Sequence, residues 1–115
     1  MIGVKTGDYL YSAVEAEKIN ALENHGDFHS HHEGWAILRE EVQEVMECSM
    51  PFSGVTGSNL DRLWGLIRDD AMIEDEAKML VEQIYEATEE MTKECIQVMA
   101  VCKKWMRLIE VEREN

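Results

Sequence analysis

The stretch from residue 74 to residue 112 limits the fold most, because it contains neither proline nor glycine. Apolar residues recur along it at the three- to four-residue spacing of one helix face. They are Leu80, Ile84, Ala87, Met91, Val98, Trp105 and Ile109. The pattern predicts one long helix over residues 74–112, or two helices that are nearly collinear.

Two further helices are predicted in the first half of the chain. The first covers residues 8–24 and ends at Gly26, because glycine readily adopts the left-handed conformation that stops a helix. Ser30 is placed to cap the second helix, with Glu33 three residues later as in a capping box. This second helix is expected to reach about Ser49.

A loop is predicted next, because Pro51, Gly54 and Gly57 follow closely on one another. A short third helix is expected from Ser58 or Asn59 to residues 69–70, with apolar side chains at helical spacing. No segment alternates like a strand. The sequence therefore predicts an all-α protein, a single domain over residues 1–115, folded as an antiparallel bundle of about four helices and completed by oligomerisation.

The composition excludes several classes of function. A net charge of −13 opposes binding to nucleic acid, which depends on Lys and Arg neutralising phosphates, whereas a metal ion or another subunit fits better. No run approaches the roughly 20 apolar residues of a membrane span, so no membrane partner is expected. Three cysteines without a CxxC motif suggest free thiols in a reducing compartment, which predicts a cytosolic protein.

Certain carboxylates occupy helix positions where apolar residues are expected. At about 100° per residue, Glu41 falls inside the apolar arc of the second helix and Glu44 lies at its edge. On the long helix, Glu94 lies within the apolar arc and Gln97 lies at its edge one turn later. Glu40 projects from the opposite, solvated side.

Inward carboxylates require a counterpart, because burying an ionised carboxylate costs several kcal/mol. Glu41, Glu44 and Glu94 come from two helices, which suggests one shared cation such as Mg²⁺, an ion that prefers oxygen ligands. In the alternative interpretation, Glu41 and Glu94 reach water at a bundle end or pair with Arg39 or Arg68.

Several other side chains are weaker candidates for ligand contacts. Imidazoles bind zinc or nickel, but no matching Cys/His pair accompanies the histidines at positions 29, 31 and 32. Trp35, Trp64 and Trp105 are candidates for stacking on a base, although aromatic residues at helical spacing are more often core. Lys104 is a candidate phosphate contact, with an ordinary surface lysine as the alternative.

Two blocks of sequence resemble a known family. Residues 38–45, LREEVQEV, are similar to the EExxE signature of the MazG-like all-alpha nucleotide pyrophosphohydrolases. Residues 93–101, KECIQVMAV, look like the EAIQVAA-type variant of the family's ExxD signature in a divergent, phage-like branch, and residues 31–37, HHEGWAI, also resemble that branch. The resemblance covers roughly residues 28–110, of which only these short blocks are specific.

The resemblance implies hydrolysis of a nucleoside triphosphate to the monophosphate and pyrophosphate by a homodimer or homotetramer that uses Mg²⁺ or Mn²⁺. It implies Glu41, Glu44 and Glu94 as metal ligands, with Gln97 at the position of the family's Asp, and it suggests Glu40 as a base. Trp35 and Lys104 are then the candidate contacts to the nucleotide substrate.

Two departures from the family pattern weaken this interpretation. Gln97 is neutral and so a weaker ligand, and the interval between Glu44 and Glu94 is longer than the family's usual spacing, which the predicted helix near residues 60–67 would explain. The alternative function is therefore a non-catalytic helical interaction protein that retains the scaffold with a degenerate metal site.

Overall fold

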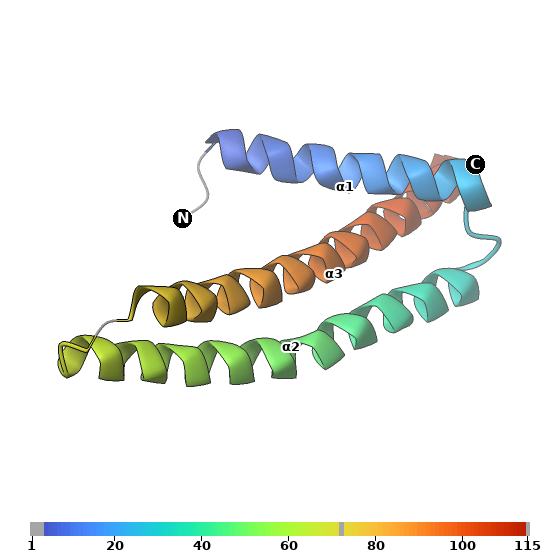
Figure 1. Cartoon of the computed structure of the whole chain (residues 1–115). Helices are drawn as coiled ribbons and strands as arrows, with labels where there is room; N and C mark the ends of the chain where they lie inside the picture. Colours follow the sequence, from blue (N-terminus) through green and yellow to red (C-terminus); the bar gives the residue numbers. More distant parts are fainter. Residues whose placement is uncertain (1–3, 72, 115) are drawn as a thin grey trace. The chain divides into compact units, whose positions relative to one another are not determined.

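A computed structural model describes residues 4–71 and 73–114, and this part of the chain forms three α-helices (Figure 1). They are α1 (Val4–His25), α2 (His31–Arg68) and α3 (Glu74–Glu114). The described residues contain no strand, so the all-α prediction is confirmed. None of the described helices combines the length and the apolar character needed to cross a membrane.

The predicted signals at the first connection are present. Gly26 adopts a positive φ of 70°, and its N–H donates to the carbonyl of Leu22 at 2.8 Å, which ends α1. Ser30 Oγ accepts the N–H of Glu33 at 3.2 Å and so caps α2. The Glu33 carboxylate bonds to His29 Nδ1 at 2.9 Å. α1 begins at Val4, four residues before the predicted start.

The prediction of a loop at residues 51–57 is wrong, because α2 continues through Pro51, Gly54 and Gly57. The two helices expected here are one helix, so the described chain has three helices where about four were predicted. An internal proline removes one backbone hydrogen bond and costs about 3 kcal/mol, and each glycine costs about 1 kcal/mol. Packing against another helix can outweigh such costs, and periodicity alone does not reveal that packing.

The C-terminus of α2 is closed by a pair of backbone hydrogen bonds around Asp70. Asp70 has a positive φ of 51°; its N–H donates to Ile67 O at 3.2 Å, and Ala71 N–H donates to Leu66 O at 2.9 Å. This is the Schellman arrangement, with an aspartate at the position that usually holds glycine.

The described helices form two compact units. The first comprises residues 1–43 and 94–115, and the second comprises residues 44–93. Because α2 and α3 are continuous, each helix contributes one segment to each unit. In the second unit, Leu66 and Leu80 are buried, and the buried amide of Asn59 donates to Leu80 O and to Gln83 Oε1, both at 2.9 Å.

The first unit packs α1 and the start of α2 against the end of α3. Val14, Phe28 and Ala100 are its buried apolar residues. Lys103 Nζ reaches Glu15 across α1 and α3 at 2.6 Å. The hydrogen bond from Lys103, supported by Lys18, lowers the pKa of the Glu15 carboxyl, and the same bond raises the pKa of Lys103.

A close contact between α2 and α3 fixes the N-terminal end of α2. A Cβ added to Gly34 would lie 3.0–3.1 Å from the indole ring of Trp105. That ring is held in place, because Trp105 Nε1 donates to His31 Nδ1 at 2.9 Å, while His31 Nε2 lies 2.6 Å from Glu112 Oε2. Glycine at position 34 therefore allows the two helices to approach each other.

Replacing Gly34 with alanine is expected to destabilise the protein. Alanine favours a helix by about 1 kcal/mol, but overpacking a fixed ring costs about 1–3 kcal/mol, so we expect a net loss of up to about 2 kcal/mol. Gly65→Ala is the control within the same helix, because a Cβ there meets nothing within 4 Å. It should stabilise by about 0.5–1 kcal/mol. Urea unfolding measures both, and equal effects of the two substitutions would contradict the contact.

Candidate metal centre and adjoining cavity

Two carboxylates from different helices meet in the first unit. Glu41 of α2 and Glu94 of α3 are both partly buried, and each offers an oxygen within 4.8 Å of the other. Glu41 Oε2 is fully buried. Because removal from water disfavours a charged carboxylate, this arrangement favours a nearby cation.

Glu44 joins the same group through the local geometry of α2. It follows Glu41 by three residues in the same continuous helix, so the two side chains lie about one turn apart on neighbouring positions. Glu44 is exposed, and one of its carboxylate oxygens belongs to the group within 4.8 Å. The structure thus brings together the three glutamates that the sequence singled out.

The donor atoms fit a hard divalent cation. Mg²⁺ binds oxygens at about 2.0–2.1 Å, so ligands on opposite sides of the ion lie about 4.2 Å apart and adjacent ligands about 3 Å apart. A group of oxygens within 4.8 Å is compatible with these separations. With oxygen as the only donor, the group suits Mg²⁺, Mn²⁺ or Ca²⁺ better than zinc.

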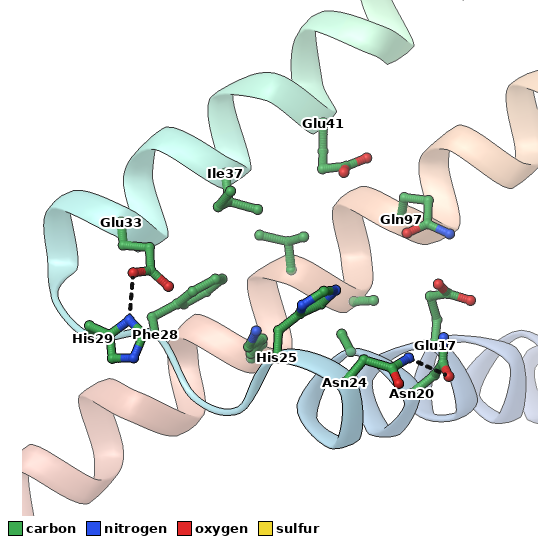
Figure 2. A pocket seen from close by; sticks show the side chains of 14 residues that line it. Glu17, Asn20, Asn24, His25, Phe28, His29, Glu33, Ile37, Glu41 and Gln97 are labelled. Atoms are coloured by element: carbon green, nitrogen blue, oxygen red, sulfur yellow. Dashed lines mark hydrogen bonds and ion pairs between the residues drawn. The ribbon is translucent and has the colours of Figure 1, made fainter.

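A cavity of about 580 Å³ adjoins Glu41 in the first unit. Figure 2 shows Glu41 and Gln97 entering it from α2 and α3, while Glu17, Asn20 and Asn24 enter from α1. The other lining residues are Ala21, His25, Phe28, His29, Glu33, Ile37, Ala100, Val101 and Lys104. The volume lies within the range of small-molecule sites.

Lys104 is the buried cation of this cavity. Its side chain is only 6% exposed, and Nζ lies 4.3 Å from the centroid of the Phe28 ring. Within the described residues Lys104 makes no ion pair or hydrogen bond, and its ammonium group lies over the face of the Phe28 ring. Glu33 lies near enough for Lys104 to contribute to its lowered pKa, although the hydrogen bond from His29 is the main cause. A buried lysine that forms no ion pair with a described carboxylate is placed to receive an anion.

The remaining predicted site residues lie in different surroundings. Gln97 is partly buried and lines the cavity one turn after Glu94. Glu40 and Trp35 are exposed on α2 and are not among the cavity-lining residues. Arg39 lies 5.4 Å from the Trp35 ring centroid.

The arginine and histidine alternatives also have defined contacts. Arg68, the other predicted partner for an inward glutamate, pairs with Asp69 at 3.0 Å. His29 contacts Glu33, and His31 lies between Trp105 and Glu112. Among the described residues, the one group with metal-site spacing contains no histidine.

Sequence reasoning missed the contribution of α1 to the site. Glu17, Asn20 and Asn24 line the cavity, yet polar residues on a helix ordinarily indicate a solvated face. Phe28 was also missed, since it lies in the connector between α1 and α2. For Glu17, Asn20 and Asn24 the sequence did contain a signal, because their spacing places all three on one side of α1.

Comparisons of the chain with family models, with curated proteins and with solved structures find no match. The resemblance described above therefore rests on the short blocks at residues 31–37, 38–45 and 93–101. The geometry of the three glutamates and of the cavity is an observation independent of that resemblance.

Mg²⁺ is expected to raise the melting temperature through the three glutamates. A ligand at ten times its Kd stabilises the folded state by about 1.4 kcal/mol, or roughly 4–8 °C for a chain of this size. Glu41→Gln and Glu94→Gln should each abolish the shift. Glu86→Gln, on the exposed surface of α3, should retain it. The measurement is thermal unfolding with Mg²⁺ against Na⁺ at equal ionic strength, and an equal shift in all variants would indicate only screening of the net charge.

Proposed function

We propose that the protein is a Mg²⁺-dependent hydrolase that converts a nucleoside triphosphate to the monophosphate and pyrophosphate. The observation that carries this proposal is the junction of an acidic group with a cavity that contains a buried lysine. Glutamates alone suit a cation, and a lysine alone suits an anion. A metal-bound polyphosphate satisfies both.

The roles of the residues follow from their charges. Glu41, Glu44 and Glu94 would hold the ion, and Mn²⁺ would suit the same oxygens. When bound, the metal neutralises phosphate charge and lowers the pKa of a coordinated water. Lys104 would bind a phosphate oxygen, and Phe28 restricts the position of its ammonium group.

Gln97 and Glu40 determine how well such a site could catalyse hydrolysis. Gln97 lines the cavity and offers a neutral amide, which can orient a water or a phosphate but adds no charge to the ion site. Glu40 is exposed, so a role as a base requires that a water or the substrate reach it. Trp35 is similarly exposed, and a contact with the nucleotide would have to form outside the cavity.

The second candidate function is a non-catalytic helical interaction protein with a degenerate metal site. The neutral side chain of Gln97 favours it, because it leaves one carboxylate fewer than the resembled family has. The two candidates differ in whether triphosphate is turned over, since both allow Mg²⁺ to bind.

Pyrophosphate release with Mg²⁺ and a panel of ribo- and deoxyribonucleoside triphosphates tests the activity. We expect Glu41→Gln to lower kcat/KM by roughly a hundredfold or more, because a ligand that acts on the transition-state charge is lost. Glu23→Gln, an exposed change on α1, should leave it unchanged. Gln97→Asp should raise Mg²⁺ affinity by restoring an anionic ligand. No turnover of any nucleotide would favour the second candidate, and release of orthophosphate instead of pyrophosphate would contradict the proposed reaction.

The proposal includes a homodimer or homotetramer in the cytosol. Among the described residues of the second unit, Leu66 and Leu80 are the buried apolar side chains. Many other large apolar side chains of this unit are exposed. The exposed set is Met46, Met50, Leu60, Trp64, Ile67, Ile73, Met79, Val81 and Tyr85. A two-helix hairpin can cover such a face by pairing with a second copy into a four-helix bundle. All three cysteines are described and none forms a disulfide, which suits a reducing compartment.

Trp64→Glu is expected to weaken self-association by at least roughly tenfold, because large aromatic residues dominate interface energies. Trp35→Glu is the matched control, since Trp35 is 55% exposed and Trp64 is 60% exposed, but Trp35 lies in the first unit. Light scattering after gel filtration gives the mass of each variant at several concentrations. A monomeric wild type at tens of micromolar, or equal loss in both variants, would contradict pairing through the second unit.

A further inference from the structure

The face of α1 that lines the cavity is polar. Glu17, Asn20 and Asn24 lie on one side of the helix and all contribute to the cavity wall (Figure 2). The face that a helix turns toward its own unit is ordinarily apolar. Ile37, Ala100 and Val101 supply an apolar surface elsewhere in the same cavity. The cavity is therefore amphipathic, as suits a planar ring with polar edges.

The α1 wall offers more hydrogen-bond acceptors than donors. Asn24 Nδ2 donates to Asn20 Oδ1 at 3.1 Å, which occupies one of the two N–H groups of Asn24 and links the two amides. Glu17 is partly buried and, when ionised, can only accept. It forms no hydrogen bond or ion pair with any residue that the structure describes. α1 contributes no Lys or Arg to the lining, so its donors are the remaining N–H groups of Asn20 and Asn24 and the imidazole of His25, and the Glu17 carboxylate can take a donor from the bound group.

The groups that would hold the phosphates lie elsewhere in the cavity. Lys104 lies over the Phe28 ring, and Glu41 belongs both to the cavity lining and to the acidic group. Phosphates are repelled by the carboxylate of Glu17 and attracted by a metal ion and by Lys104. The part of a nucleotide that meets α1 is then its base.

We infer that the α1 wall selects nucleobases that carry an exocyclic amino group, an inference that rests on the proposed nucleotide site. An amino group donates to Glu17 and to the free acceptors of Asn20 and Asn24. A carbonyl at the same ring position donates nothing and leaves the carboxylate facing another acceptor. Cytosine is therefore preferred to uracil, and adenine to hypoxanthine.

The test measures binding separately from turnover. The α,β-methylene analogues of CTP, UTP, ATP and ITP are titrated into the full chain with Mg²⁺ by calorimetry, and hydrolysis of the natural nucleotides is assayed in parallel. We expect the amino-bearing member of each pair to bind about tenfold to a hundredfold more tightly, as a charge-assisted hydrogen bond provides. In Glu17→Gln the ratio should fall toward one, because a glutamine amide both donates and accepts.

The ratio is the informative quantity, because removing one negative charge strengthens binding of every anionic nucleotide. Glu23→Gln removes the same charge from α1 outside the cavity lining and should preserve the wild-type ratio. A wild-type ratio near one, a ratio unchanged in Glu17→Gln, or failure of all four analogues to bind would overturn the inference. Selective binding without pyrophosphate release would leave the inference in place and refute only the proposed hydrolysis.

Discussion

The uninterrupted backbone of α3 is the constraint on which both units depend. Without proline or glycine, the helix runs from Glu74 to Glu114 and provides one wall to each unit. In the second unit its Leu80 is buried and its carbonyl receives the amide of Asn59. In the first unit Ala100 is buried, and the indole ring of Trp105 packs closely against Gly34. A break in this helix would affect both units, because within each unit the other helical segments pack against one part of α3.

Three basic residues in the last third of α3 each contact a residue of α1 or of the connector between α1 and α2. Lys103 pairs with Glu15, Lys104 lies on the Phe28 ring, and Arg107 Nε contacts Asp27 at 3.2 Å. These cations therefore face α1 and the connector in a chain whose net charge is −13. The pairs with exposed partners contribute little to stability, since solvent screens them. Lys104 differs because the residue is buried and forms no ion pair within the described part of the chain, and such a cation gains from a bound anion.

The helices were predictable from the sequence to the extent that local signals decide them. Gly26 and Ser30 act as the caps that their residue types predict, and the span of α3 follows from its apolar period. Pro51 misled the prediction because its cost is local, whereas the packing that offsets it involves residues far along the chain. For the same reason the period of α2 and α3 identified Glu41 and Glu94 as inward, but could not show that α1 would line a cavity beside them. Asn20 and Asn24 look like solvated residues until the neighbouring helices are in place.

The charge balance of the proposed site bears on how many ions it holds. Three carboxylates leave one divalent ion with a net charge of about −1 before substrate arrives, and the neutral Gln97 does not change it. Two ions would leave the same three ligands with a net charge of about +1, and each ion would have fewer protein oxygens. Mg²⁺ commonly takes one or two carboxylates together with water and phosphate oxygens, so three glutamates are enough for a single ion. In the proposed site, Lys104 would supply a positive charge in the cavity that a second ion would otherwise provide, which links the acidic group to the buried lysine.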